Sequence, residues 1–355
     1  MVTERADVVV VGAGLLGLAT AWALRGRREV LVLEQATIGH ARGGSHGPSR
    51  VFRFGYADAL YVRLAQLALP RWRALEAETG TPLLDVTGQL TFGAGAEPVA
   101  AALSEAGAPA QRLSAAEVVA AFPMFAGHGP ALYEPGSGVI AAAATLAALC
   151  TAATCDVREE CAVTAIIDGE PVRVETLAGA ISANVVVLTA GPWTGALCPD
   201  LVPAGTNATR EHVAYLQPKA ALEPHPIFVD FSDPAVYGLP TPGSDLYKIA
   251  LHHGGEVIDP QAPADPPPAR AVAALEAAAR AWLPAYEPVA VEVDTCIYDN
   301  TPNEDFVLHR AGNVVVGAGT SGHGFKFGPL LGELLASLVT GTEPSTPLER
   351  FALHC

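Results

Sequence analysis

The chain has 355 residues, of which 50% are hydrophobic and 16% are charged. This composition excludes a disordered protein, and the length favours two lobes over a single core. The chain carries 21 basic and 37 acidic residues, so its formal net charge is −16. A surface this acidic repels phosphate backbones, which excludes nucleic acid as an expected partner.

Cysteine spacing and the N-terminal sequence limit the possible classes of protein further. The 6 cysteines form no CxxC pair and no zinc-ligand spacing, so we expect neither a metal site nor a disulfide framework, and a reducing, cytoplasmic compartment. The apolar run from Val8 to Leu24 follows the acidic Asp7 and is interrupted by glycines. A strand, turn and helix explain this run better than a membrane helix or signal peptide. We therefore expect no membrane association.

The first half of the chain opens with a buried strand at 7–11, a helix at 15–24 and a second strand at 30–33. An irregular polar stretch is predicted at 35–56, then a helix at 60–79 that is kinked or divided at Pro70. The alternation at 84–92 predicts a strand. Ser114 and Glu117 form a capping box that opens a short helix before Pro123.

The second half begins with a buried helix predicted at 141–154 and a hairpin whose strands, 164–167 and 172–177, flank Asp168-Gly169. A buried strand at 185–188 runs into Gly191. Strands are expected over about 210–252, and a helix over 269–282. The theme of strand, glycine and helix then returns, with a strand at 313–316, four glycines between 317 and 324, and a helix at 329–339.

Three separated segments thus share the order strand, glycine, helix. They predict an α/β fold in which a Rossmann-like nucleotide-binding lobe is assembled from discontinuous segments. We place residues 1–84, 143–205 and 307–355 in this lobe. The insertions, 85–142 and 206–306, are predicted to form a substrate lobe around an antiparallel sheet.

The sequence Gly12-x-Gly14-x-x-Gly17 lies between the first strand and the first helix. In such a loop Gly12 permits the tight turn, Gly14 lets a pyrophosphate approach the backbone, and Gly17 allows close packing of helix on strand. Glu34, at the end of the second strand, is placed to accept ribose hydroxyls, which disfavours the 2′-phosphate of NADP. On these residues alone, FAD and NAD both remain.

Four further stretches carry a family resemblance. They are residues 44–53 (GSHGPSRVFR), 237–240 with 246–252 (YGLP and LYKIALH), 296–306 (CIYDNTPNEDF) and 319–327 (GTSGHGFKF). In this order they resemble the D-amino-acid-oxidase-like flavoprotein superfamily. Within it, the chain is most similar to the monomeric sarcosine oxidase and N-methyltryptophan oxidase group, which includes biosynthetic oxidases of cyclic imino acids.

The resemblance implies a monomeric enzyme with FAD in the first lobe. It would oxidise the C–N bond of an N-alkyl or cyclic amino acid to an imine, and dioxygen would be reduced to hydrogen peroxide. The flavin supplies the redox chemistry, and the protein supplies orientation and electrostatics. The implied partners are a small carboxylated amine and dioxygen.

The resemblance also implies residue roles on the cofactor side. Cys296 matches the cysteine that bonds covalently to the flavin, although by itself it would pass for a buried free thiol. The other cofactor contacts fall on the glycine loop and on the matching stretches: Gly12, Gly14, Gly17, Glu34, Ser45, Arg50, Gly322, His323, Gly324 and Lys326.

On the substrate side, Arg53 and Lys326 match the pair that grips a carboxylate, for which a planar guanidinium and an ammonium are well suited. Lys248 matches the lysine that promotes oxygen reduction, and its apolar neighbours favour a buried position over a solvent-facing one. The resemblance places His46 and Arg50 near the flavin, where a positive group would stabilise the anionic reduced flavin. The alternative is that they merely contact the FAD phosphate or the backbone. The aromatic residues are expected either in the active-site wall or in the core: Tyr237, His252 and Tyr298.

Some positions depart from the family pattern where it borders the active site: Pro48, Pro192, Asp299, Asn300 and Thr320. These departures leave the identity of the amine substrate open, but they do not change the type of reaction that the resemblance implies. Two other functions stay in view, a flavin dehydrogenase that passes electrons to a protein carrier and an inactive flavin-binding subunit. Lys248 argues against the first, and the intact set of Arg53, Lys248 and Lys326 argues against the second. A nicotinamide-dependent dehydrogenase is disfavoured by the C-terminal stretch.

Overall fold

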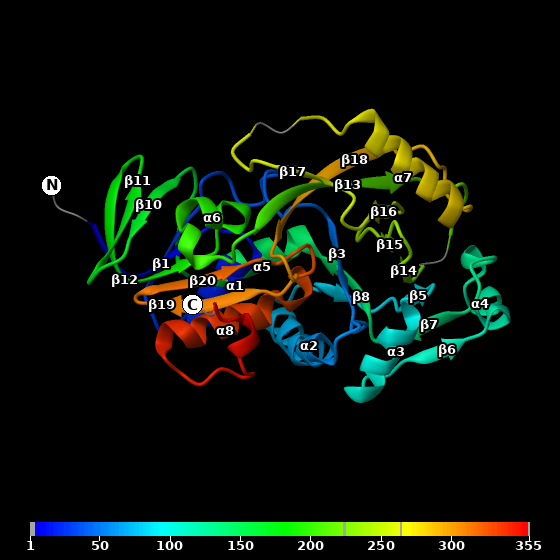
Figure 1. The fold of residues 1–355 in the computed structure, drawn as a ribbon, viewed down its shortest axis with the longest axis horizontal. Helices are drawn as coiled ribbons and strands as arrows, with labels where there is room; N and C mark the ends of the chain where they lie inside the picture. The colour runs from blue at the N-terminus through cyan, green and yellow to red at the C-terminus, as the bar shows by residue number, and fades with distance from the viewer. Residues whose placement is uncertain (1–3, 223–224, 263–264, 354–355) are drawn as a thin grey trace.

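The computed structural model describes residues 4–222, 225–262 and 265–353. Two large sheets lie side by side, the first on the left of Figure 1 and the second on the right. The helices are α1 (Leu15–Leu24), α2 (Ala59–Thr79), α3 (Ala96–Glu105), α4 (Ala115–Ala121), α5 (Ala142–Ala153), α6 (Thr194–Leu197), α7 (Ala269–Trp282) and α8 (Gly328–Thr340). No helix in these ranges is both long and apolar enough to cross a membrane.

The first sheet is built around parallel strands. Its eight strands are β1 (Glu4–Val11), β2 (Val30–Leu33), β9 (Asp156–Arg158), β10 (Val163–Ile167), β11 (Val172–Thr176), β12 (Gly179–Leu188), β19 (Val307–Ala311) and β20 (Val314–Ala318). β1 pairs in parallel with β2 and with β12, and β12 pairs in parallel with β20. The predicted assembly of this lobe from separated segments is therefore confirmed.

The second sheet is mostly antiparallel. Its nine strands are β5 (Gln89–Phe92), β6 (Gln111–Leu113), β7 (Ala131–Glu134), β13 (Asn207–Leu216), β14 (Ile227–Asp230), β15 (Val236–Pro240), β16 (Tyr247–Leu251), β17 (Glu256–Ile258) and β18 (Glu292–Asn300). Among the described pairings within this second sheet, only that of β14 with β5 is parallel. The predicted fold class holds, and the domain boundaries stay a prediction.

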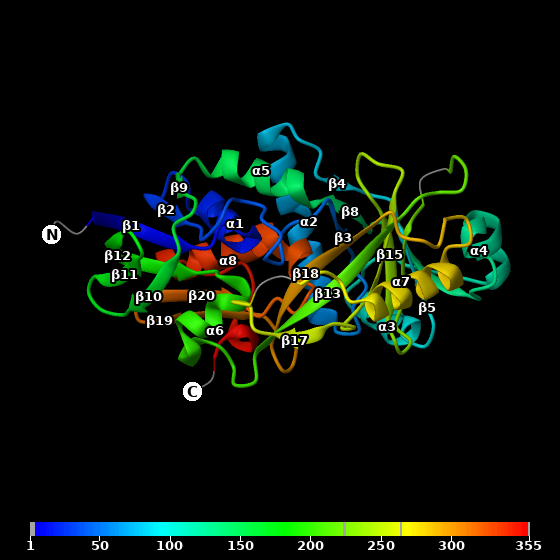
Figure 2. The same cartoon turned by 90° about the horizontal axis from the view of Figure 1, so that it is seen from above.

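A small third sheet contacts both helix α5 and the second large sheet. It consists of β3 (Ser49–Phe52), β4 (Leu84–Asp85) and β8 (Gly138–Ala141), and β3 also contacts β15 of the second sheet. In Figure 2, β13 and β18 extend from the second sheet towards the first lobe. Of these strands, β18 carries Cys296 and Tyr298, and β3 carries Arg50, to the region where the lobes meet.

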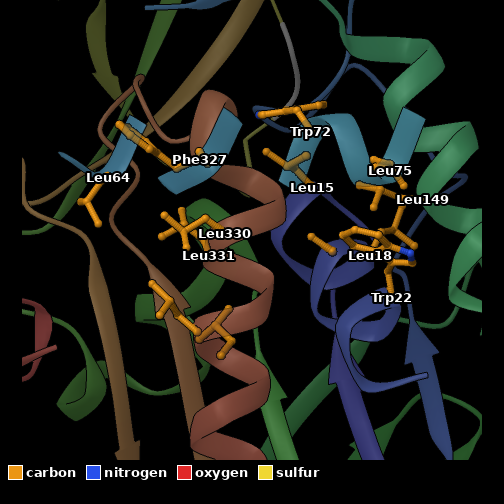
Figure 3. Packing of buried hydrophobic residues seen from close by; sticks show 14 of the residues in the cluster. Leu15, Leu18, Trp22, Leu64, Trp72, Leu75, Leu149, Phe327, Leu330 and Leu331 are labelled. Atoms are coloured by element: carbon orange, nitrogen blue, oxygen red, sulfur yellow. The ribbon is translucent and has the colours of Figure 1, made fainter. Parts of the chain in front are cut away.

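The main core lies where α1, α2, α5 and α8 pack on the first sheet. Figure 3 shows its leucine and tryptophan side chains converging from these helices, among them Leu18 and Trp22 of α1, Trp72 of α2, Leu149 of α5 and Leu330 of α8. A second core lies between α7 and the second sheet, where the ring of Trp282 stacks on Phe228 with 4.9 Å between centroids. Burial of these apolar faces holds each helix on its sheet.

Several sequence-based elements differ from the structure. Residues 49–52 form β3 inside the stretch expected to be irregular, because they pair with β8 rather than through any pattern of their own. The strand expected at 84–92 is divided into β4 and β5, which belong to different sheets. α2 continues through Pro70 as a single helix of 21 residues, so Pro70 is not a junction between two helices, and a kink there stays a prediction.

Candidate active site

The glycine loop has the tight geometry that its spacing predicts. Gly12 has a φ of 101°, and a Cβ there would lie 2.6 Å from the carbonyl oxygen of Thr189. A Cβ on Gly17 would lie 1.9 Å from the carbonyl oxygen of Gly12, so helix α1 starts directly against the turn. Ser45 reaches the same place, since its hydroxyl accepts a hydrogen bond from the Leu15 amide at 3.1 Å.

Glu34 lies at the end of β2 beside this loop and is buried. Its carboxylate accepts hydrogen bonds from the Ala13 amide at 2.8 Å and the Ala36 amide at 3.0 Å, and it pairs with His40 at 3.2 Å. Burial alone would raise the pKa of Glu34, but these three contacts outweigh burial and lower it. A carboxylate that stays ionised at this strand end can accept ribose hydroxyls.

A cavity of about 520 Å³ opens beside the loop. Predicted site residues from both lobes line it: Gly12, Gly14, Glu34, Ser45, His46, Arg50, Tyr237, Lys248, Cys296, Tyr298, Gly322 and Gly324. Its walls thus combine a pyrophosphate-type loop, an ionised ribose acceptor and the Cys296 thiol, a set that fits FAD. Gly17 lies outside the lining and packs α1 against the turn, as expected of it.

A smaller cavity of about 80 Å³ adjoins the larger one. It is lined by the remaining predicted residues Arg53, His252, His323 and Lys326, together with Arg50, Tyr237, Lys248, Tyr298 and Gly322, which line both cavities. His323 and Lys326, expected at the cofactor, therefore lie on the small cavity rather than on the large one. The shared residues make the small cavity a candidate substrate site beside the cofactor site.

Cys296 and Arg50 form one cluster with the loop after Ala41. The thiol of Cys296 donates to the Gly44 carbonyl oxygen and accepts from the Arg50 guanidinium, each at 3.7 Å. Arg50 also donates to the carbonyl oxygens of Gly44 at 2.9 Å and His46 at 2.6 Å. His46 pairs with Asp294 at 3.3 Å. These contacts fix the loop against β18 and hold the thiol at the wall of the large cavity.

Lys248 on β16 is only 4% exposed. Its ammonium donates to the Ser49 carbonyl oxygen at 3.3 Å and lies 6.0 Å from the ring centroid of Tyr215. Burial, followed by the charge of Arg50, lowers the pKa of Lys248 to about 7. A buried lysine at the border of both cavities requires a functional explanation, because burial of an ammonium without an acidic partner is costly.

Arg53 lies just after β3, and its Nη1 atom is buried without a hydrogen-bond partner. Its guanidinium stacks on the ring of Tyr56, 4.5 Å from the centroid, and lies 5.2 Å from that of Phe231. Lys326 is 4% exposed and donates to the Tyr56 hydroxyl at 2.9 Å. Among the described residues, no carboxylate forms an ion pair with either cation. Burial, followed by the charge of Arg53, lowers the pKa of Lys326 well below its usual range. An anionic group bound between the two side chains would favour the charged form of Lys326, so the pair is suited to bind an anion.

Part of the wall of the small cavity is neutral. Burial, followed by the charge of His253, lowers the pKa of His252 to about 3, and burial raises the pKa of Tyr237 to about 12. The His252 ring lies 5.9 Å from that of Tyr298 and 6.4 Å from that of Tyr237. These three side chains therefore supply an uncharged aromatic surface beside the two cations.

Two of the positions that depart from the family pattern form a pair. The carboxylate of Asp299 accepts hydrogen bonds from both the amide, at 3.0 Å, and the hydroxyl of Thr320. Asp299 is buried, and its burial raises the pKa of the carboxyl group. The hydrogen bonds between Asp299 and Thr320 thus fasten the end of β18 to the turn before Gly322.

Sequence reasoning missed three residues at the site, of which Glu134 and Glu211 are buried and Tyr56 is half-buried. Tyr56 contacts both Arg53 and Lys326, and the aromatic run beside Arg53 was the available signal. Glu134 is fully buried and accepts hydrogen bonds from Gly55, Gln89 and Ser137. Burial raises its pKa, against the charge of Arg53. Glu211 lines the large cavity with one unpartnered oxygen. Nothing in the sequence distinguishes these two acids from exposed ones.

Comparison with known proteins agrees with this geometry. The human peroxisomal sarcosine oxidase is 35% identical over 98% of this chain and 95% of its own length. N-methyl-L-tryptophan oxidase of Yersinia pestis is 32% identical over 96% of each chain. The structure of NikD, described as an unusual amino acid oxidase essential for nikkomycin biosynthesis, has a TM-score of 0.88 at 30% identity and covers 99% of this chain and 98% of its own.

A family model decides between the two dinucleotides that the glycine loop left open. The model for FAD dependent oxidoreductases matches residues 7–338, which include the glycine loop, both cavities and most of α8. The match and the relatives confirm the resemblance seen in the four sequence stretches. The chain belongs to the family of FAD-dependent oxidoreductases.

Proposed function

We propose that the protein oxidises the C–N bond of a small amino acid whose nitrogen is secondary or cyclic, with dioxygen as electron acceptor. The observation that carries this proposal is the unpartnered, buried Nη1 of Arg53 in a cavity that also holds Lys326. A carboxylate would satisfy both cations and leave the rest of the molecule against the neutral wall. The names of the human and Yersinia relatives support an N-methylated amino acid.

Bound FAD supplies the acceptor for the two electrons and the hydrogen that leave the carbon beside nitrogen. The chain's own residues orient the substrate. Arg53 and Lys326 bind the carboxylate, and Tyr237, His252 and Tyr298 enclose the apolar part and exclude water. Lys248, at the border of the cavities, supplies positive charge where negative charge develops on dioxygen.

The volume of the small cavity supports a small substrate. A water molecule needs roughly 10–15 Å³ of this kind of volume, so 80 Å³ accommodates roughly five to eight waters. Sarcosine, proline or pipecolate is of that size, whereas an indole side chain would require the wall to move. We therefore infer that the amine is closer in size to sarcosine than to N-methyltryptophan.

A screen of matched amines tests the proposal. We expect peroxide from at least one of sarcosine, small N-methyl amino acids, proline, pipecolate and unsaturated cyclic imino acids. Sarcosine, proline and pipecolate are each compared with the matching amine that lacks the carboxylate, namely dimethylamine, pyrrolidine and piperidine. Loss of the carboxylate should lower kcat/KM by about tenfold or more, because a charge-assisted hydrogen bond contributes about 1.5–3 kcal/mol. Equal efficiency of both partners of a pair would refute the carboxylate site.

The alternative of a dehydrogenase that uses a protein carrier predicts slow reaction with dioxygen. The position of Lys248 favours the oxidase, because a carrier-dependent enzyme has no use for a buried cation at the border of both cavities. The same screen separates the two functions: turnover that requires an added electron acceptor and yields no peroxide would favour the dehydrogenase. A chain that binds FAD but turns over no amine would favour the inactive subunit.

We also propose that Cys296 holds FAD covalently. Its thiol lines the large cavity and contacts Arg50, which supports this role. We expect the intact chain to show the mass of an FAD adduct, and the yellow colour to stay with acid-precipitated protein. Cys296→Ser should lose both, whereas the matched variant Cys198→Ser should keep them. A colourless pellet from the unaltered protein, with no flavin on the Cys296 peptide, would contradict covalent attachment.

We further infer a monomer in the cytoplasm. The cytoplasmic assignment rests on the cysteine pattern of the sequence, and the monomer rests on the family resemblance. Size-exclusion chromatography with light scattering measures the oligomeric state directly, and cell fractionation measures the compartment.

A further inference from the structure

Tyr56 lies between the two cations of the small cavity and contacts both. The Arg53 guanidinium stacks on the Tyr56 ring, and the Tyr56 hydroxyl accepts a hydrogen bond from the Lys326 ammonium at 2.9 Å. Arg53 follows β3, whereas Lys326 belongs to the 3₁₀ turn Phe325–Phe327 before α8, so the two come from distant parts of the chain. Tyr56 is thus a common contact through which their relative position can be fixed.

The hydrogen atoms of this cluster can be assigned from its chemistry. Nε2 of His323 lies 2.9 Å from the carbonyl oxygen of Glu304, which can only accept, so Nε2 carries the proton. Burial, followed by the charge of Lys326, lowers the pKa of His323 to about 3, so the ring is neutral and Nδ1 is an acceptor. The Tyr56 hydroxyl, 3.2 Å from Nδ1, therefore donates to it.

A directed chain of hydrogen bonds follows. Lys326 donates to Tyr56, Tyr56 donates to His323, and His323 donates to the Glu304 carbonyl oxygen. Lys326 also donates to the His323 carbonyl oxygen at 2.7 Å, so two of its three N–H bonds are committed. The third N–H remains for a ligand, as does the unpartnered Nη1 of Arg53.

The surroundings hold Tyr56 and Lys326 in place. The ring of Tyr61 stacks on that of Tyr56 with 5.1 Å between centroids, and the ring of Phe327 lies 5.9 Å away. The Trp72 indole donates to the backbone carbonyl oxygen of Lys326 at 2.7 Å. Neither Tyr56 nor Lys326 can shift without breaking several of these contacts.

We propose that Tyr56, with its proton directed by His323, is a positioning residue that aims Lys326 at the carboxylate also bound by Arg53. This inference rests on the proposed carboxylate site and deepens it. If the Tyr56 hydroxyl could not donate to His323, it would no longer be fixed as an acceptor for Lys326. The tautomer of His323 thereby sets the direction in which the Lys326 ammonium points.

The test uses Tyr56→Phe in the complete protein with its cofactor. The ring that stacks on Arg53 remains, and only the hydroxyl is lost. The probe is cyclopentanecarboxylate, which has the shape of proline but no nitrogen to oxidise. Its Kd, measured by calorimetry, should rise about tenfold, since a misdirected ammonium forfeits a charge-assisted hydrogen bond. For a turned-over amine, KM should rise while kcat changes less than twofold.

The control is Tyr61→Phe, which removes a neighbouring hydroxyl that donates to Asp305 at 2.9 Å. It should leave the Kd within twofold of the parent value, even if the melting temperature falls. His323→Asn offers an amide oxygen at about the reach of Nδ1 and should keep most of the affinity, whereas His323→Leu should lose it as Tyr56→Phe does.

A double variant shows whether Tyr56 acts through Lys326. If it does, adding Tyr56→Phe to Lys326→Met should raise the Kd no further than Lys326→Met alone. Additive losses, or an unchanged Kd in Tyr56→Phe, would overturn the inference. Arg53→Ala separates this failure from a failure of the proposed function. If the parent does not bind the probe, or if Arg53→Ala leaves its Kd unchanged, the carboxylate site and this inference fall together.

Discussion

Replacement of Lys248 by methionine should slow the reaction of the reduced enzyme with dioxygen by about two to three orders of magnitude, the range for removal of one preorganised stabilising group. Methionine has a similar length and an apolar end, so it can fill the buried position on β16. The reduction of the cofactor by substrate should change little, because the Lys248 ammonium contributes to the charge that develops on dioxygen rather than to substrate binding.

The reaction with dioxygen should also depend on pH in the parent. Burial and the charge of Arg50 lower the pKa of Lys248 to about 7. Lysine is charged below its pKa, so the rate should fall as the pH rises through the lysine pKa. The value of about 7 already includes the opposing charges of Asp294 and Cys296. Negative charge on a bound cofactor would stabilise the ammonium further, so the midpoint should lie at or above about 7.

Stopped-flow measurement of the two half-reactions checks both statements. The pH dependence should be absent from Lys248→Met if this lysine causes it. Lys219→Met is the matched control, since the Lys219 side chain is exposed and donates to the Pro284 carbonyl oxygen, away from both cavities. Oxygen reactivity of Lys248→Met equal to that of the parent would reject the role of Lys248.

Replacement of Arg53 by alanine should weaken the binding of small carboxylates by about one to two orders of magnitude. The variant removes a guanidinium with an unpartnered Nη1, and Lys326 alone must then bind the anion. The variant should also have a separate effect, because the charge of Arg53 partly offsets the burial that raises the pKa of Glu134. Without it, Glu134 should bind a proton more readily.

Competition experiments measure this loss. Acetate and cyclopentanecarboxylate should inhibit the parent competitively and inhibit Arg53→Ala poorly, with KM for the amine raised in parallel. Arg63→Ala serves as the control, since Arg63 is exposed and its contact with Glu105 lies on the surface of α2 and α3. Unchanged inhibition in Arg53→Ala would move the carboxylate site elsewhere.

The parts of the site that are local in sequence were predictable. Gly12, Gly14 and Gly17 are separated by a spacing that only one type of turn explains, and Glu34 follows at the distance set by one helix and one strand. Lys248 was predictable as buried from its apolar neighbours. In each case the physical cause lies within a few residues of the position itself.

Other features depend on contacts between distant segments. β3 has no strand pattern and exists because Gly138–Ala141 pairs with it. Helix α3 follows a stretch rich in glycine and alanine and is fixed by packing against α2 and β7. Tyr56 could be seen as aromatic, but its role requires the turn at Phe325–Phe327 to be brought beside it, which no local pattern reveals.

The size of the 80 Å³ cavity has a consequence for how the enzyme would respond to its surroundings. A ligand that fits there has few atoms, and even the best small ligands gain at most about 1.5 kcal/mol for each non-hydrogen atom. Most of its binding free energy must then come from one carboxylate and two cations. Wherever the amine concentration stays below the Kd of this site, flux through it would follow the supply of the amine almost in proportion.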